Sequence, residues 1–127
     1  MKIEYTDNLS VDVCRANPAK VFVFGDNLAG WGTAGQACIR REPNAFGIPT
    51  KRYPTMEKGA FFTDQECERN HVLTALRELY ILGRTHTIVF PSKGLGTGMA
   101  KMNTSSPKLY AEMTNIMRKH FGARNGS

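Results

Sequence analysis

The chain alternates between short apolar runs and longer segments in which apolar residues recur every three or four positions. Apolar runs typical of strands occupy residues 2–5, 21–24, 46–49 and 86–91. Residues 63–83 and 106–122 carry apolar side chains at helical spacing, and a short helix is expected at 34–41. Strands that alternate with helices predict an α/β domain with a mostly parallel sheet.

The ends of the two longer helices carry recognisable start and stop signals. Thr63 and Glu66 have the spacing of a capping box, in which the Thr hydroxyl accepts the N–H of the Glu. Pro107 suits the first turn of the last helix. Gly83 and Gly122 follow the last apolar positions, where glycine commonly ends a helix.

Length and composition indicate one globular domain. With 127 residues, 41% hydrophobic and 22% charged, the chain is long enough to bury a core of its own. We expect this domain to span residues 1–121. The polar, glycine-containing segment 122–127 is expected to be a disordered tail.

Charge and cysteine content indicate the kind of binding partner and the cellular compartment to expect. The net charge of +6 favours an anionic partner, either a phosphorylated small molecule or a nucleic acid. Because the basic residues are dispersed, a solvated basic surface is the alternative. Cys14, Cys38 and Cys67 are widely spaced, which predicts reduced thiols and neither a metal site nor a cofactor. Without an apolar segment for export or membrane insertion, we expect a cytoplasmic protein that binds no membrane.

Two glycine-rich segments, each following an apolar run, hold seven of the twelve glycines. The first covers residues 25–35 and the second covers residues 91–98. Glycine lets backbone N–H groups approach a ligand, and such a loop before a helix is an anion site. Parallel strands place their carboxyl ends at one edge, where ligands bind. We therefore predict that both segments converge on one ligand with two linked phosphates.

A dinucleotide-binding fold and simple tight turns are the alternatives for these glycines. Gly30, Gly32 and Gly35 match G-x-G-x-x-G, but residues 25–29 separate them from the strand. Thr55 also stands where a dinucleotide-binding unit has an acidic residue, so that fold is disfavoured. Tight turns without a ligand stay open, although so many glycines cost chain entropy.

Several motifs resemble one known family. Residues 24–27 (F-G-D-N), 34–37 (A-G-Q-A) and 90–100 (F-P-S-K-G-L-G-T-G-M-A) are similar to macrodomains. The nearest branch contains terminal ADP-ribose glycohydrolases and small phage macro-like proteins. Residues 3–9 and 48–52 extend the resemblance over most of the chain. It implies a three-layer α/β/α domain with a mixed, mostly parallel sheet. It also implies an ADP-ribose-type ligand, either free or attached to a macromolecule.

The resemblance further implies that different segments of the chain contact different parts of that ligand. The first glycine segment would surround the distal ribose, and the second would hold the diphosphate through its N–H groups. Asn8 would lie on the adenine side, and the hydroxyls of Ser92 and Thr97 near the phosphates. The expected ligand-binding residues are Asn8, Gly25, Asn27, Gly30, Gly32, Gly35, Ser92, Gly94, Leu95, Gly96, Thr97 and Gly98.

Whether the protein is an enzyme stays open at this point. Lys51 resembles the nucleophilic lysine of that branch, and Asp26 follows a strand where a catalytic base is expected. Ala100 replaces the branch's acidic residue and transfers no proton. Hydrolysis of ADP-ribosyl linkages, binding without turnover and nucleic-acid binding are the alternatives. Lys51 is otherwise an exposed basic residue, and Asp26 with Asn27 a local turn.

Overall fold

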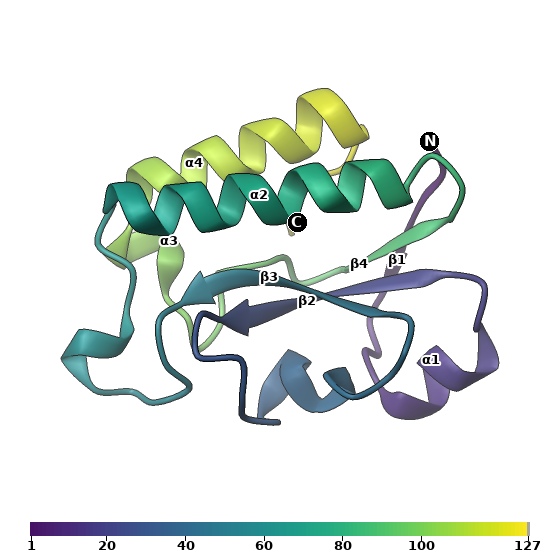
Figure 1. Cartoon of the computed structure of the whole chain (residues 1–127), viewed down its shortest axis with the longest axis horizontal. Helices are drawn as coiled ribbons and strands as arrows, with labels where there is room; N and C mark the ends of the chain where they lie inside the picture. Colours follow the sequence, from purple (N-terminus) through teal and green to yellow (C-terminus); the bar gives the residue numbers. More distant parts are fainter. Residues whose placement is uncertain (127) are drawn as a thin grey trace.

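The computed structural model describes residues 1–126; Ser127, the last residue of the predicted tail, lies outside the described residues. A four-stranded sheet lies between two layers of helices (Figure 1). The strands are β1 (Ile3–Thr6), β2 (Val21–Asn27), β3 (Ala45–Lys51) and β4 (Ile88–Pro91). The α-helices are α1 (Val11–Ala16), α2 (Glu66–Leu82), α3 (Met102–Ser105) and α4 (Pro107–Ile116). Shorter helical turns are η1 (Gly35–Ile39), η2 (Lys58–Ala60) and η3 (Met117–Phe121), the last continuing α4. The predicted α/β fold class is confirmed.

The sheet is parallel throughout, in the order β1-β4-β2-β3. A mixed sheet was expected, but the antiparallel pairing found among residues 1–126 is one isolated bridge between Lys51 and Phe61. β3 is an edge strand, as the proline in its sequence predicts, because Pro49 has no N–H to donate to a second neighbour. Because the strands are parallel, the carboxyl ends of all four lie along the same end of the sheet.

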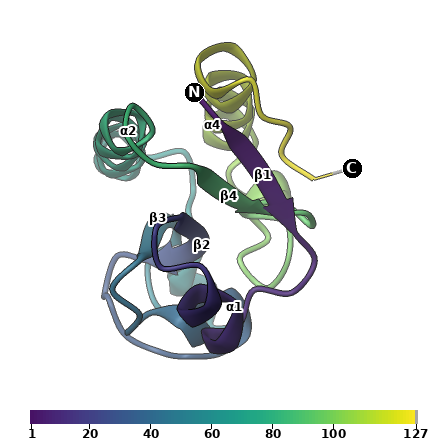
Figure 2. The same cartoon turned by 90° about the vertical axis from the view of Figure 1, so that its right-hand side faces the viewer.

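Helices α2 and α4 cover one face of the sheet (Figure 2). Val23, Ile48 and Phe90 are fully buried there and belong to one apolar cluster with Leu79 of α2 and Met113 of α4. Burying a side chain of this size stabilises a fold by about 1.5–3 kcal/mol. This cluster holds the central strands in place beneath the candidate site.

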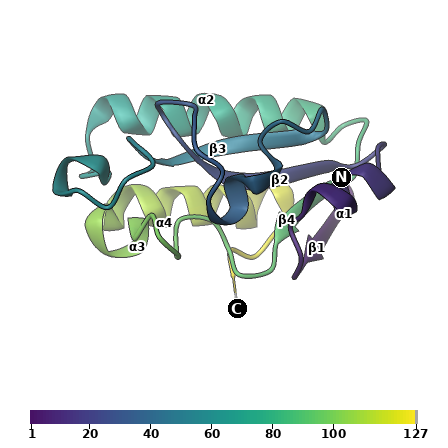
Figure 3. The same cartoon turned by 90° about the horizontal axis from the view of Figure 1, so that it is seen from below.

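Helix α1 and η1 cover the opposite face (Figure 3). Phe22 and Phe24 point to this side because side chains alternate along a strand, and they pack with Cys14 and Ile39. The continuous apolar run 21–24 is therefore buried on both faces of the sheet, as its pattern predicts.

Neither α1 nor α3 is predicted by the apolar pattern. Both are too short, at six and four residues, to show helical periodicity. The start of α1 does carry a local signal, because the hydroxyl of Ser10 accepts the N–H of Val13 at 3.2 Å. None of the helices formed by residues 1–126 is both long and apolar enough to cross a membrane.

The start of α2 differs from the predicted capping box. The helix begins at Glu66, and the carboxylate of Glu68 accepts the N–H groups of Thr63 and Gln65, each at 2.9 Å. Glu68 is fully buried and also pairs with Arg52 at 2.6 Å. The Thr63–Glu66 prediction is wrong because the carboxylate two residues further on reaches both the helix start and this distant guanidinium.

The tail also differs from its prediction. Gly122 ends the helical run with φ of 64°, and the chain then turns back toward β1. Ala123 is buried, and the guanidinium carbon of Arg124 lies 3.9 Å from the ring centre of Tyr5. Disorder is therefore the wrong prediction for residues 122–126, because contacts with residues distant in sequence hold this segment.

Candidate functional site

A cavity of about 320 Å³ opens at the carboxyl ends of β2 and β3. Its walls come from residues 25–37, residues 50–56 and residues 96–100, the last of these following β4. In Figure 1 this is the end toward which the arrowheads of β2 and β3 point. Parallel sheets bind ligands at the carboxyl ends of their strands, which is where this cavity lies. Its volume is near the lower limit of the range found for small-molecule pockets.

The structure brings most of the predicted site residues into this cavity. Those that line it are Gly25, Asp26, Asn27, Gly32, Gly35, Lys51, Gly96 and Gly98. Those that do not are Asn8, Gly30, Ser92, Gly94, Leu95 and Thr97. Both glycine segments therefore contribute walls to one cavity, whereas the expected adenine side does not.

The residues outside the cavity have other surroundings. Asn8 lies exposed in the turn after β1, where its N–H donates to the hydroxyl of Thr6. Gly30 lines a separate hollow beside α2. The side chain of Leu95 is fully buried in the core, and the hydroxyl of Thr97 donates to the carbonyl of Lys93. No side chain of this set contacts the cavity.

Gln36 joins the two glycine segments and is absent from the expected ligand-binding residues. Its Oε1 accepts the N–H of Gly25 at 2.7 Å, and its Nε2 donates to the carbonyl of Gly94 at 3.0 Å. A Cβ on Gly25 would lie 3.2 Å from that Oε1, tighter than most real contacts. The A-G-Q-A motif is the sequence signal, and in the structure its glutamine links β2 to the loop after β4.

The second glycine segment presents a row of backbone N–H groups without protein acceptors. Within residues 1–126, no protein acceptor pairs with the N–H groups from Gly96 to Ala100. Gly96 has φ of 80°, and a Cβ there would lie 3.0 Å from the side chain of Met102. Glycine is therefore required at this turn. Successive N–H groups of this kind form an anion-binding concavity.

Arg40 fixes the first glycine segment. Its Nε donates to the carbonyl of Gly32 at 2.9 Å, and its Nη2 donates to the carbonyl of Trp31 at 3.3 Å. The same Nη2 pairs with Asp26 Oδ1 at 2.5 Å. One guanidinium thus ties the loop to the end of β2, and it neutralises a carboxylate that lines the cavity.

Asp26 and Asn27 are the last two residues of β2, and their side chains bond local backbone groups at the turn that follows the strand. Asp26 Oδ1 accepts the N–H of Asn27 at 2.7 Å, while its Oδ2 lies so close to Gly47 that a Cβ there would be 2.6 Å away. Asn27 donates to the carbonyl of Trp31 at 2.8 Å and accepts the N–H of Gly30 at 2.9 Å. This geometry favours the turn over a catalytic base at Asp26, and Lys51 remains the candidate reactive group.

Lys51 is buried at the end of β3, with 7% of its surface exposed. Its Nζ lies 4.8 Å from the ring centre of Phe61 and 3.4 Å from the sulfur of Met56. Among the described residues, no carboxylate lies within 4.0 Å of it. Burial lowers the pKa of Lys51 below its ordinary value, and the nearby Lys101 ammonium lowers it further. The alternative of an exposed basic residue is wrong, because the segment that leads to Phe61 folds back over Lys51.

Lys51→Met is expected to raise the free energy of unfolding at pH 7 by about 0.5–2 kcal/mol. The pKa of Lys51 in the folded protein is lowered. At a pH below that pKa, the buried ammonium therefore lowers the free energy of unfolding. Between this pKa and the unfolded value of about 10.4, the unfolded chain binds more protons, and stability rises with pH. The gain from Lys51→Met should therefore shrink as the pH approaches about 10, measured by urea unfolding across this range.

Lys58→Met is the matched control for this prediction. Lys58 is exposed in η2, close in sequence to the segment that covers Lys51. Its replacement is expected to change the free energy of unfolding by less than about 0.5 kcal/mol at either pH. A loss of stability in Lys51→Met at pH 7 would contradict the assignment of a buried, uncompensated ammonium.

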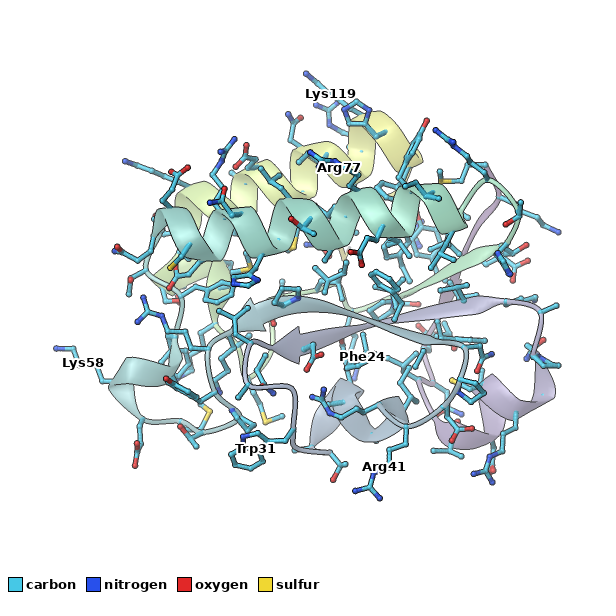
Figure 4. All side chains as sticks on the ribbon, viewed as in Figure 1. Phe24, Trp31, Arg41, Lys58, Arg77 and Lys119 are labelled. Atoms are coloured by element: carbon cyan, nitrogen blue, oxygen red, sulfur yellow. The ribbon has the colours of Figure 1, made fainter. Side chains whose placement is uncertain are left out.

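Large apolar side chains are exposed around the mouth of the cavity. Trp31 is 59% exposed, and Met56 and Met99 are 54% and 53% exposed, although all three line the cavity. Figure 4 shows Trp31 projecting away from the sheet at this end of the molecule. The indole of Trp31 is therefore exposed at the rim of the cavity, and the cluster is typical of a binding surface.

The comparisons with known proteins give one match. Residues 4–116 match the model of a family of unknown function (DUF7831). No curated protein and no solved structure gives a significant match. The function of the site therefore has to follow from its own geometry and chemistry.

Proposed function

Because the chain belongs to DUF7831, a family of unknown function, we propose its activity from the site alone: it binds ADP-ribose or a related nucleotide diphosphate. The cavity between the two glycine segments is the binding site. The observation that carries this proposal is the row of unpaired N–H groups from Gly96 to Ala100, most of whose residues line the cavity.

The charges around the cavity support an anionic ligand. The ammonium of Lys51 lines the cavity, and the ammonium of Lys101 lies 6.0 Å from the ring centre of Phe61, which Lys51 also faces. Asp26 lines the cavity as well, but its charge is balanced by Arg40. A diphosphate would therefore meet N–H dipoles and ammonium groups without an unpaired carboxylate opposing it.

Two features bear on turnover and point in opposite directions. Burial increases the fraction of Lys51 present as the free amine, which is the nucleophilic form. Its nitrogen would bond to the anomeric carbon of the distal ribose while the bond to the leaving group breaks. Water would then displace this nitrogen from the anomeric carbon, which releases ADP-ribose and, with loss of a proton to solvent, restores the free amine. Ala100 lines the cavity where the resembling branch has an acid, so the leaving group would take its proton from water. We propose binding as the primary function, with slow hydrolysis as its catalytic form.

Calorimetric titration with ADP-ribose tests the binding proposal. We expect saturable heat at micromolar to millimolar ligand, with only weak dependence on salt. Absence of heat at millimolar ADP-ribose would contradict it. Nucleic-acid binding predicts instead an affinity for oligonucleotides that falls steeply with salt, by about 0.7–0.9 log units per log unit of salt for each phosphate neutralised.

Mass spectrometry of an ADP-ribosylated peptide after incubation with the protein separates the catalytic from the non-catalytic form. Release of ADP-ribose that disappears in Lys51→Ala and persists in Lys58→Ala would establish the lysine as the reacting group. Binding without release in the parent protein would identify a module that senses or sequesters the nucleotide.

A further inference from the structure

We propose that Asn125 is a positioning residue for the anion-binding segment, which it holds through the peptide groups of Leu95. This inference rests on the proposed function, because it concerns the same row of N–H groups from Gly96 to Ala100. It assigns a role at the ligand site to a residue of the tail, far from the cavity in sequence.

The side chain of Asn125 pairs with both backbone polar groups of Leu95. Its Oδ1 accepts the N–H of Leu95 at 2.6 Å, and its Nδ2 donates to the carbonyl of Leu95 at 3.0 Å. A neighbouring strand would offer the same pair of bonds. A third bond runs from Nδ2 to the hydroxyl of Thr114 on α4 at 3.2 Å. The segment is thereby tied to a helix that packs in the main core.

The glycines at this junction are explained by the approach of the tail. Gly94 has φ of 89°, and a Cβ there would lie 3.0 Å from Asn125 Oδ1. Gly126 has φ of 84°, and a Cβ there would lie 3.2 Å from the carbonyl oxygen of Lys93. Tail and loop are therefore packed backbone to backbone. This explains why Gly94, expected to contact ligand, lies outside the cavity lining.

Gln36 holds the same junction from the other side. Its Nε2 donates to the carbonyl of Gly94, the residue directly before the one that Asn125 pairs with. The peptides of Gly94 and Leu95 are thus fixed from two directions, and the unpaired N–H groups begin at Gly96. A loop ordered in advance binds its ligand more tightly, since less conformational entropy is lost on binding.

The tail is itself ordered before it reaches the loop. Arg124 donates its N–H to the hydroxyl of Tyr5 at 3.0 Å, and its guanidinium stacks over the same ring. The N–H of Ala123 donates to the carbonyl of Met117 at 3.0 Å. The two residues before Asn125 are therefore held by contacts with β1 and with η3, and these contacts fix the position of Asn125.

The test compares Asn125→Ala with Asn44→Ala, a control at a distance from the cavity. Asn44 also bonds backbone, donating to the carbonyls of Cys14, Asn17 and Lys20, each at 3.0 Å. We expect Asn125→Ala to weaken ADP-ribose binding at least 10-fold in calorimetry. Asn44→Ala, although destabilising, is expected to leave the affinity within about 2-fold of the parent. Asn125→Ser, too short to reach both groups of Leu95, replaces the alanine variant if that fails to fold.

Amide hydrogen exchange supplies a second readout that needs no ligand. The N–H of Met102 donates to the carbonyl of Gly96 at 2.8 Å, and that of Lys101 donates to the carbonyl of Gly98 at 3.1 Å. Both are expected to exchange faster in Asn125→Ala and at the parent rate in Asn44→Ala. Parent-like exchange and affinity in Asn125→Ala would overturn the inference. If the parent protein itself gives no heat with ADP-ribose, the proposed function fails, and the exchange rates still decide whether Asn125 positions the loop.

Discussion

Glu68→Ala is expected to lower the free energy of unfolding by about 3–5 kcal/mol. The carboxylate is fully buried, and it accepts two backbone N–H groups as well as the guanidinium of Arg52. Its removal leaves both N–H groups without an acceptor and a half-buried cation without its carboxylate partner, which costs more than the loss of the bonds alone. Urea unfolding at pH 7 measures the change.

Glu112→Ala is the matched control for this loss. Glu112, in α4, forms an ion pair of similar length, 2.7 Å, with Arg69 of α2. Both side chains of this pair are partly exposed. We expect its replacement to cost less than about 1 kcal/mol. Equal losses for the two variants would show that the Glu68 carboxylate does not organise the segment between β3 and α2. Because Arg52 directly follows Lys51, Glu68→Ala is also expected to expose that lysine to amine reagents.

Gly98→Glu is expected to weaken ADP-ribose binding by at least about 3 kcal/mol, more than 100-fold. A carboxylate at this position adds like charge beside the proposed diphosphate. Gly98 is a suitable place for it, because a Cβ there meets no atom within 4 Å and its φ lies outside the left-handed region. Gly96 is less suitable, since its φ of 80° and Met102 would strain any side chain. Calorimetric titration measures the loss.

Gly98→Gln separates charge from bulk in this experiment. The amide has nearly the same shape as the carboxylate and no charge, so most of the affinity should return. If both variants lose binding equally, bulk is responsible. Parent-like affinity in Gly98→Glu would show that this segment does not hold the phosphates, and the proposed function would fail with it.

The fold was largely predictable because its determinants are local. The run 21–24 is apolar at every position, which is typical of a strand buried on both faces, and it forms part of an inner strand of the sheet. Pro107 begins α4 and Gly122 ends the helical run, as expected from their backbone preferences. The position of the glycine segments at the carboxyl ends of β2 and β4 follows from the same patterns, although β2 extends three residues into the first segment.

The details of the site were less predictable because they depend on contacts between distant residues. Lys51 resembles a surface residue in sequence, and it is buried only because Phe61 pairs across it. Asp26 has the sequence position of a base, but the pairing with Arg40 engages it as an anchor. Local patterns carry no signal for such partners. They also could not show that the tail returns to the second glycine segment.

The position of Trp31 has a practical consequence. It is the single tryptophan of the chain, and its indole is largely in water at the rim of the cavity. Intrinsic fluorescence excited at the indole band therefore arises from the site alone, without an extrinsic label. Small quenchers such as iodide should reach this fluorophore freely in the protein without ligand, and a bound ligand should shield it. Quenching of Trp31 fluorescence can therefore be used to screen for ligands of the cavity.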